Sequence, residues 1–412
     1  MIDVINRLVW SIAFVFLIGS GLYFTFKLRF RQFNIKGMID SFKNGNDLFS
    51  SLSMSLGARI GVGSLAGIGL AIKMGGIGTI FWIWVSSIIV VINSFVESFL
   101  AVKYKKNNIG GPSYYIRDGL GKKRLSFVYA FLIIITYIFG FLTIQSNTIT
   151  RVFNGFGFSS LLIGFIIVII SSYIIFGGDK YIISFMSRLV PIMCLIYLLV
   201  GLYILFININ VLPSIILSII KEAFNYKSLG IGVVTSLIIG FRRGIFSTEA
   251  GIGTGAIASS TSLDNSPIRQ GYVQMVGVYF TSLVICTITA LIILTSNYNS
   301  VIFNNINGIE ITSYAFNYHL GRFGDFILII SIILFSFSTI IAGYYYGENN
   351  LKFITSKRAF IFILKIVTLI LLFIGSIMSA GIIWNMVDIL VGLLAIINVS
   401  SLFMLRKKIE IK

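Results

Sequence analysis

Long apolar stretches separated by short polar segments run through nearly the whole chain. About eleven of them are long enough to cross the ~30 Å hydrocarbon core of a membrane as helices. They cover residues 5–26, 49–73, 78–103, 126–147, 159–177, 185–207, 230–262, 272–295, 325–347, 358–375 and 380–405. The pattern therefore predicts an all-α polytopic membrane protein.

Two of these stretches are interrupted by glycines and charged residues. Residues 57–64 have the sequence Gly-Ala-Arg-Ile-Gly-Val-Gly-Ser, and residues 240–251 have the sequence Gly-Phe-Arg-Arg-Gly-Ile-Phe-Ser-Thr-Glu-Ala-Gly. A helix broken inside the membrane exposes backbone N–H and C=O groups that a continuous helix uses internally. We therefore predict that the helices unwind near 57–64 and 244–251 and bind a ligand there.

The two interrupted stretches occupy corresponding places in two halves of the chain. Residues 49–207 and 230–405 each hold five stretches and each open with an interrupted one. Because five is odd, the second half is inverted relative to the first, as in transporters built from inverted repeats. Residues 1–48 add an N-terminal helix and a cytoplasmic loop, residues 208–229 form an extracytoplasmic connector, and residues 406–412 form a basic tail.

The composition excludes a water-soluble protein, since 57% of the residues are hydrophobic, 11% are charged and the mean hydropathy is +0.97. The net charge of +18 does not indicate a nucleic-acid partner. Most Lys and Arg residues lie in loops on one side of the predicted membrane, which by the positive-inside rule is the cytoplasm. We expect a multi-pass protein of the cell (inner) membrane with its N-terminus outside and its C-terminus in the cytoplasm.

Few residues suit metal or acid–base chemistry. Cys194 and Cys286 lie in apolar stretches, which argues against a disulfide framework or a thiolate metal site. His319 is the one histidine and falls in a polar segment, where we expect an ordinary surface residue. No span contains a histidine, paired acids with metal-ligand spacing or a serine–base pair, so we predict that the protein is not an enzyme.

The glycines of the two interrupted stretches suit close approach of a ligand to the backbone. Gly61 and Gly63 have this role in the first, and Gly244, Gly251 and Gly253 in the second. Freed N–H and C=O groups would satisfy both ends of an amino-acid zwitterion. The alternative is close packing of helices through small residues.

Ionisable residues inside predicted spans are costly and need partners. Arg59 and Glu249 either pair across the site, or Arg59 extends its guanidinium to the cytoplasmic mouth. We expect Glu97 and Asp388 to hold helices together by hydrogen bonds. Trp384 either lines a substrate cavity or anchors a span at the membrane surface.

Several hydroxyl residues suit a monovalent cation. Ser336, Ser338 and Thr339 lie within four positions of an otherwise apolar stretch, and they are placed to face carbonyls of the first break near Ala58 and Gly61. The alternative is hydrogen bonding of each hydroxyl to the preceding turn of its own helix.

Six motifs along the chain resemble the alanine or glycine:cation symporter family, which includes sodium:alanine symporters. They are residues 59–67, 75–85, 110–116, 243–251, 269–275 and 344–348. The resemblance implies a leucine-transporter-type fold of the amino acid-polyamine-organocation superfamily. It also implies sodium-coupled uptake of a small neutral amino acid, alanine or glycine, with sodium as the co-transported ion. We expect a lipid bilayer as the surroundings and no obligate protein partner.

The resemblance and the breaks together give the expected site. The substrate-binding candidates are Gly61, Gly63, Ser64, Gln145, Asn147, Gly244, Phe246, Ser247, Thr248 and Trp384. The candidates for sodium are Ala58, Gly61, Ser336, Ser338 and Thr339.

The chain departs from the family pattern where stronger oxygen donors are expected. Ser64 and Thr248 stand where the family has Asn, Thr281 stands where it commonly has Asp, and Val391 replaces another Asn. We therefore expect a single sodium site and not two. Proton-coupled or weakly coupled transport of an altered substrate and a channel-like permease are the alternatives.

Overall fold

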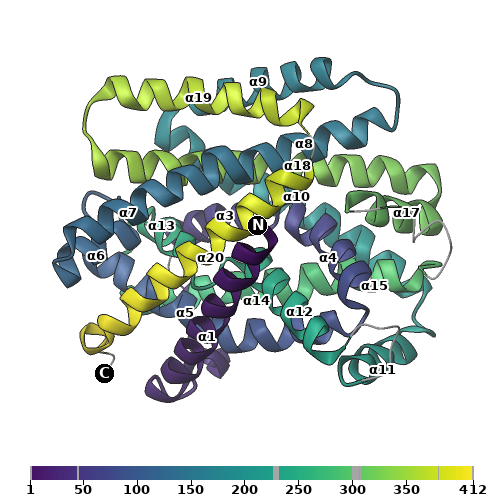
Figure 1. The fold of residues 1–412 in the computed structure, drawn as a ribbon, viewed down its shortest axis with the longest axis horizontal. Helices are drawn as coiled ribbons and strands as arrows, with labels where there is room; N and C mark the ends of the chain where they lie inside the picture. Colours follow the sequence, from purple (N-terminus) through teal and green to yellow (C-terminus); the bar gives the residue numbers. More distant parts are fainter. Residues whose placement is uncertain are drawn as a thin grey trace.

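The computed structural model describes residues 2–43, 46–225, 232–298, 306, 308–378 and 380–410. These residues form helices joined by short segments, and no β-strand occurs among them (Figure 1). The two cysteines, Cys194 and Cys286, are free and buried, as expected.

The helices follow the predicted apolar stretches. Their bounds are α1 Ile2–Lys27, η1 Arg31–Phe33, α2 Ile35–Phe42, α3 Asn46–Arg59, α4 Val62–Gly75, α5 Thr79–Tyr104, α6 Pro112–Leu120, α7 Lys123–Ile134, η2 Ile135–Phe141, α8 Leu142–Asn154, α9 Ser160–Phe176, α10 Gly178–Ile207, α11 Leu212–Ala223, α12 Val233–Thr248, α13 Thr254–Ser260, α14 Pro267–Tyr279, η3 Phe280–Cys286, α15 Thr287–Thr295, α17 Ile309–Leu320, α18 Arg322–Ile354, α19 Arg358–Ile377, α20 Ala380–Met404 and η4 Arg406–Lys408. The segments η2 and η3 are π-helical turns inside longer helices.

Nine helical segments in the described part of the chain are long and apolar enough to cross a membrane. The pair α3–α4 is one of them, whereas α9 has only 17 residues and the break between α12 and α13 leaves two short pieces. The chain is therefore a multi-pass, all-helical membrane protein. The count of eleven spans and the inverted repeat stay predictions.

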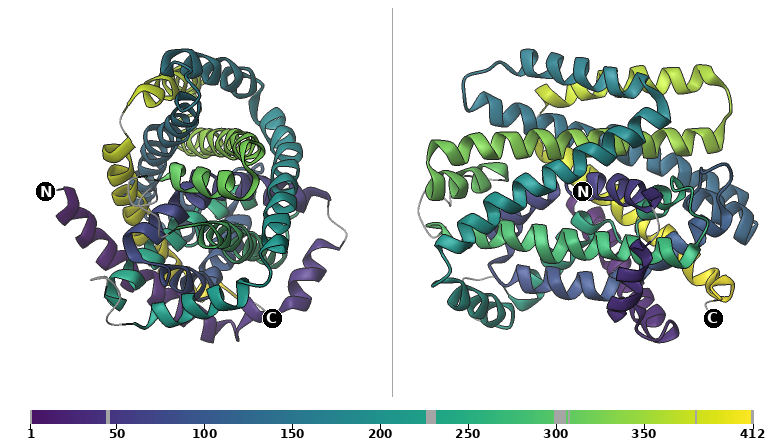
Figure 2. Two further views of the ribbon diagram at one scale, coloured as in Figure 1. Left: turned by 90° about the vertical axis from the view of Figure 1, so that its right-hand side faces the viewer. Right: turned by 180° about the vertical axis from the view of Figure 1, so that it is seen from behind.

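Two groups of helices can be recognised from their packing. In one, α5 packs against α12, α13 and α14, and α3 contacts α13 and α14. In the other, α8, α9, α18 and α19 pack against one another, with α19 and α9 along one edge of the molecule (Figures 1 and 2). The helices α1 and α20 pair with each other and lie against the first group. Because α3 also packs against α10 and α18, the first break lies where the two groups meet.

Segments predicted as loops contain additional helices. The connector after residue 207 holds α11, and the segment before α18 holds α17. His319 is consequently not a surface loop residue: it is half-buried on α17, and its ring nitrogens contact Asn208, Thr295 and the carbonyl of Ile292. A short polar loop and a short amphipathic helix have similar compositions, which is why the pattern missed it.

Candidate functional site

The first break is short. Helix α3 ends at Arg59 and α4 begins at Val62, so Ile60 and Gly61 are the residues between the two helices. The hydroxyl of Ser64 donates to the carbonyl oxygen of Gly61 over 2.8 Å and closes the first turn of α4. The prediction of unwinding within 57–64 is confirmed, although only its centre unwinds.

Backbone donors at the start of α4 are only weakly used. The N–H of Val62 donates to Gln145 Oε1 over 3.3 Å, and the N–H of Gly63 has no acceptor among the described residues. The first N–H groups of a helix carry a partial positive charge. The start of α4 therefore offers donors suited to an anionic group.

The end of α12 lies directly against the start of α4. A Cβ atom on Gly63 would be 3.0 Å from the ring of Phe246, and Ser247 Oγ donates to the carbonyl of Gly63 over 3.4 Å. No hydrogen bond within the described chain reaches the carbonyls of Phe246, Ser247 and Thr248. A positive helix end and a negative helix end thus meet at one buried place.

Aromatic side chains cover this place. The ring of Phe246 stacks on Phe141, with centroids 5.1 Å apart, and lies 5.3 Å from the ring of Trp384. Phe246 is buried and Trp384 is half-buried. The space beside Gly63 is accordingly narrow.

Two hydroxyl groups of α18 face the end of α3. Ser338 and Thr339 both donate to the carbonyl oxygen of Gly57, over 3.0 and 2.9 Å, and Thr339 Oγ1 lies 3.4 Å from the carbonyl of Ala58. Each hydroxyl also hydrogen-bonds to the carbonyl oxygen of Phe335 in its own helix. The predicted contact with the first break and the alternative of bonding to the preceding turn therefore both occur. The arrangement gathers four hard oxygen atoms, the kind that a sodium ion requires.

The other two candidates for sodium differ from each other. A Cβ on Gly61 would be 2.4 Å from Thr339 Oγ1, so Gly61 borders the oxygen cluster. Ser336 is buried, and its hydroxyl has no partner in the described structure. Two residues along a helix point to different sides, which separates Ser336 from Ser338.

The second break lies later than predicted. Helix α12 continues through Thr248, and the unwound residues are Glu249 to Gly253. The candidates Gly244, Phe246, Ser247 and Thr248 are therefore helical, which corrects the expected unwinding at 244–248. Glu249, Gly251 and Gly253 have positive φ angles of 53°, 86° and 104°, so the chain turns sharply here.

Side chains from other helices already form hydrogen bonds with the backbone of the second break. Asn398 Nδ2 donates to the carbonyl of Gly251 over 2.9 Å, and Tyr129 Oη donates to the carbonyl of Ile252 over 2.6 Å. This break therefore has few free groups for a ligand.

Gly244 packs two helices together. A Cβ on Gly244 would be 2.5 Å from Ser86 Oγ of α5, and one on Gly240 would be 2.6 Å from the carbonyl of Thr79. For these two glycines the structure matches the helix-packing alternative.

Gln145 and Asn147 have different surroundings, although they are only two residues apart on α8. Gln145 reaches the first break through Val62. Asn147 instead donates to the carbonyls of Gly375 and Met378 and fixes the end of α19. A helix turns about 200° in two residues, so both could not face the same break.

Arg59 does not extend to an aqueous mouth. It is 2% exposed, and its guanidinium donates to Ser94 Oγ and to the carbonyl of Gln274, each over 3.2 Å. A Cβ on Gly255 or Gly277 would be 2.6 Å from this guanidinium, so these glycines make room for it. The snorkelling interpretation is wrong.

Glu249 is not in direct contact with Arg59 either. Its two carboxylate oxygens accept hydrogen bonds from Tyr137 Oη and Thr254 Oγ1, over 2.6 and 2.8 Å. No ion pair within 4.0 Å joins Arg59 to an acid among the described residues, although Glu249 and Glu97 both act on it electrostatically. Arg59 and Glu249 therefore interact across the site only through their charges and not through a direct ion pair.

A second charged cluster lies beside the aromatic cover. Asp388 Oδ2 is 3.4 Å from a nitrogen of Arg242 and 3.4 Å from one of Arg243. The guanidinium of Arg243 lies over the rings of Phe246 and Trp384, at 5.7 and 5.4 Å. Asp388 holds α20 against α12, as expected.

A vestibule of about 570 Å³ opens where α3 and α10 begin and where α13 and α18 end. Its walls include Ser50, Asp179, Ser184, Ser262 and Tyr345.

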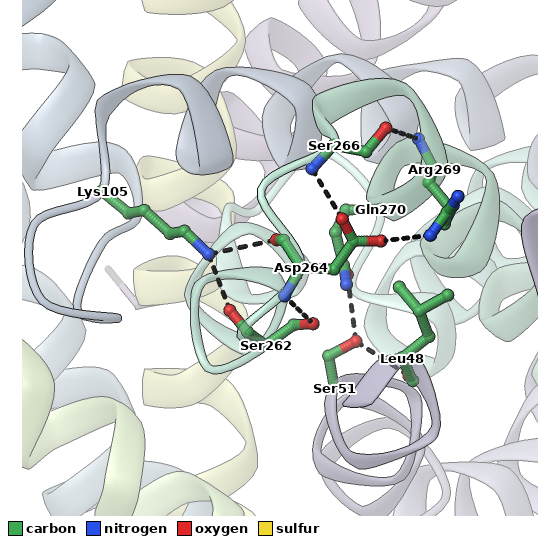
Figure 3. Close-up of polar contacts among 8 residues, drawn as sticks. All are labelled: Leu48, Ser51, Lys105, Ser262, Asp264, Ser266, Arg269 and Gln270. Carbon is green, nitrogen blue, oxygen red and sulfur yellow. Dashed lines mark hydrogen bonds and ion pairs between the residues drawn. The ribbon is translucent and has the colours of Figure 1, made fainter. Parts of the chain in front are cut away.

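The loop between α13 and α14 at this vestibule is fixed by polar contacts (Figure 3). Lys105 Nζ donates to the carbonyls of Ser262 and Asp264, over 2.6 and 3.1 Å, and Asp264 forms an ion pair of 3.1 Å with Arg269. Burial lowers the pKa of Lys105, and nearby Asp264 partly offsets this effect. Ser51 of α3 joins the same region through Gln270 over 2.9 Å.

Sequence reasoning missed several residues of the site. The carbonyl of Gly57, and not only that of Ala58, receives the α18 hydroxyls. Asn398 and Tyr129 carry no motif that marks them, because their role depends on which helices meet. Of the missed residues, only Arg243 could have been indicated by the sequence, because it is a charged residue in an apolar stretch.

Comparison with known proteins gives the family of this chain. The model of the sodium:alanine symporter family matches residues 1–411. The chain belongs to the sodium:alanine symporter family. Among its relatives, the probable sodium/glutamine symporter GlnT of Bacillus subtilis is 36% identical over 99% of this chain and 88% of that protein. The sodium/alanine symporter AgcS of Methanococcus maripaludis is 30% identical over 98% of this chain and 94% of its own.

Solved structures show the fold alone. The manganese transporter of Eremococcus coleocola, in complex with an aromatic bis-isothiourea compound, has a TM-score of 0.54 and 14% identity over 86% of this chain and 76% of that chain. Members of the sodium:alanine symporter family are transporters and not enzymes, and the family supports sodium-coupled amino-acid symport in a membrane.

Proposed function

We propose that this symporter couples sodium entry to the uptake of alanine or glycine by alternating access. The proposal rests on the meeting of the weakly hydrogen-bonded start of α4 with the end of α12, next to the oxygen cluster of Gly57, Ala58, Ser338 and Thr339.

The helix ends suit an amino-acid zwitterion. The N–H groups of Val62 and Gly63 would receive the carboxylate, because a helix start attracts an anion. The carbonyls of Phe246, Ser247 and Thr248 would receive the ammonium group. Gln145, already at Val62, would adjust to the carboxylate.

The aromatic cover favours a small side chain. Phe246 lies within contact of Gly63, and Phe141 and Trp384 pack around it. Alanine or glycine needs little displacement of these rings, whereas a longer side chain needs their rearrangement. The relative GlnT is named for glutamine, so glutamine is the most informative competitor.

A single sodium ion fits the hydroxyl pattern. Ser338 and Thr339 turn toward carbonyls of another helix. The hydroxyls at Ser64, Thr248 and Thr281 each bond to their own helix, to Gly61, Gly244 and Gly277 respectively. Only the first group is available to share an ion between two helices.

The transport cycle follows from the proposed topology. The N-terminus lies outside and the C-terminus in the cytoplasm, and residues 49–207 and 230–405 form inverted repeats. The vestibule beside Ser50 and Ser262 is then the cytoplasmic approach. Movement of the α3–α5–α12–α14 group against α8, α9, α18 and α19 opens the site to each side in turn.

Uptake into proteoliposomes tests the proposal. Purified protein is reconstituted, and labelled alanine uptake is measured under an inward sodium gradient, with glycine, glutamine, leucine and phenylalanine as competitors. We expect saturable, sodium-stimulated uptake that glycine inhibits and leucine does not. Uptake that prefers bulky or charged amino acids would contradict the assigned pocket.

Proton coupling is the second candidate. The relative YrbD, 35% identical over 98% of this chain and 89% of its own, is named a putative sodium/proton-dependent alanine carrier. The same assay under a proton gradient without sodium separates the two ions. A channel-like permease would show uptake that does not saturate.

A further inference from the structure

Three ionisable residues from separate elements form a buried cluster behind the two breaks. Arg59 is 2% exposed, Glu97 0% and Glu249 1%. Arg59 is the one base in the group, so two ionised acids would leave an unbalanced negative charge at membrane depth. Such a charge is very costly unless a cation or a proton neutralises it.

The two acids differ in how their oxygens are satisfied. Both oxygens of Glu249 accept bonds from hydroxyl donors, Tyr137 and Thr254, as an ionised carboxylate requires. Glu97 accepts from Asn398 Nδ2 through Oε2 over 2.9 Å, while its Oε1 has no partner in the described structure. The unmet oxygen identifies Glu97 as the acid that needs neutralising.

Among the residues that the structure describes, Arg59 is the one base near Glu97. Arg59 approaches from α3 and Glu249 from the second break, and Tyr115 of α6 and Tyr129 of α7 also face this region. Tyr115 donates to Asn398, and the phenols stay neutral near pH 7. The neutral amide of Asn398 comes from α20.

Glu97 Oε1 and Arg59 are close without being paired. A Cβ on Gly255 would be 3.1 Å from Glu97 Oε1 and 2.6 Å from Arg59 Nη2, so both atoms border the same small space. Arg59 instead donates to Ser94. An ionised Glu97 would draw Arg59 toward itself.

We propose that Glu97 is a proton-binding site of this transporter. In the closed conformation a proton from water is bound to Oε1, which gives a neutral acid. When the vestibule side opens, the proton returns to water, Glu97 ionises and Arg59 turns from Ser94 toward it. Arg59 adjoins Ala58 in the sodium cluster, so protonation of Glu97 is coupled to the sodium site.

The inference rests on the proposed function and is tested by a pH profile. Alanine exchange is measured with equal sodium on both sides of the proteoliposome membrane, from pH 5.5 to 8.5. We expect the wild-type rate to change at least about fivefold, since one titrating group permits up to about tenfold per pH unit. Glu97→Gln, which imitates the neutral acid, is expected to reduce the change to less than about twofold.

Glu348→Gln is the matched control. Glu348 is also a buried acid, but it pairs with Lys352 over 2.9 Å, so its variant should keep the wild-type profile. Glu97→Asp keeps a titrating group and should shift the midpoint, which provides a second readout if Glu97→Gln fails to fold.

A wild-type rate that is constant with pH, an unchanged profile in Glu97→Gln, or an unshifted midpoint in Glu97→Asp would overturn the inference. Absence of any sodium-stimulated exchange in the wild type would instead contradict the proposed function. The two failures are therefore distinguishable.

Discussion

The two breaks differ in how the protein uses their backbone groups. At the first, the N–H of Gly63 is free and that of Val62 has one long hydrogen bond. At the second, the carbonyls of Gly251 and Ile252 accept hydrogen bonds from Asn398 of α20 and Tyr129 of α7. Unwound backbone is therefore not by itself a ligand site.

This difference assigns ligand binding to the first break and structural stability to the second. The first break lies between the two packing groups and can exchange weak internal contacts for ligand contacts at little cost. The second is held by hydrogen bonds from α7 and α20, so a ligand would have to displace good hydrogen bonds there. Changes at the first break should impair transport, and changes at the second should impair folding.

The largest effect is expected at Gly253. Its φ of +104° is strained for any other residue, and a Cβ would be 2.2 Å from Tyr129 Oη and 2.4 Å from Pro112 Cγ. Gly253→Ala should therefore destabilise the fold by about 3 kcal/mol or more. Size-exclusion chromatography and thermal unfolding in detergent measure this loss. Gly67→Ala, where the Cβ meets nothing within 4 Å, is the control. A stable Gly253→Ala protein would undermine the distinction between the breaks.

A transport defect without a folding defect is expected at Gly61. A Cβ there would be 2.4 Å from Thr339 Oγ1 and 3.3 Å from Gln145 Nε2, and both are side-chain atoms that can rotate away. Gly61→Ala should remain folded but lose about 100-fold in sodium-driven alanine uptake, because Thr339 leaves the oxygen cluster. Normal uptake by this variant would remove the first break from the binding site.

Loss of the α18 hydroxyls should act on sodium specifically. The double variant Ser338→Ala with Thr339→Ala leaves the ion with backbone carbonyls alone, so sodium stimulation of uptake should be lost. Ser331→Ala is the control, because Ser331 bonds only to Ile327 in its own helix. With one sodium site, the wild-type sodium curve should be hyperbolic with a Hill coefficient near one. A steeply sigmoidal curve argues for a second site.

The smallest effect concerns the helix that supports α4. Thr312 of α17 donates to the carbonyl of Leu65 over 3.1 Å, and His319 holds α17 to Asn208 and Thr295. Burial lowers the pKa of His319 in the folded protein. The neutral His319 ring therefore stabilises the fold fully above pH 6.5, and this stabilisation is lost as the pH falls through the lowered pKa. The expected destabilisation at pH 5.5 is below about 1 kcal/mol. Thermal unfolding of wild type and His319→Gln at pH 5.5 and 8 measures it, and an equal pH dependence in both would exclude His319 as the cause.

The apolar pattern predicted the helices and the first break, because membrane burial requires long apolar stretches and a Gly-x-Gly pair weakens a helix. It predicted the second break too early. Gly240 and Gly244 resemble break residues in sequence, but they face α5 in a continuous helix. Whether a glycine serves packing or unwinding depends on the neighbouring helix, which one sequence does not reveal.

The candidate site was only partly predictable for the same reason. Ser338, Thr339 and Gln145 reach the first break as expected. Asn147 turns to α19, and Glu97 obtains its significance from Asn398, which lies 301 positions away in the chain. Contacts between distant helices decide such roles.

Hydrogen–deuterium exchange shows directly which of the two breaks binds the ligand. Purified protein is compared without ligand and with sodium plus alanine, following peptides that cover 57–65 and 249–255. We expect the ligand to slow exchange at the first break, while the second is already protected without ligand and changes little. Ligand-induced protection at 249–255 with none at 57–65 would contradict it.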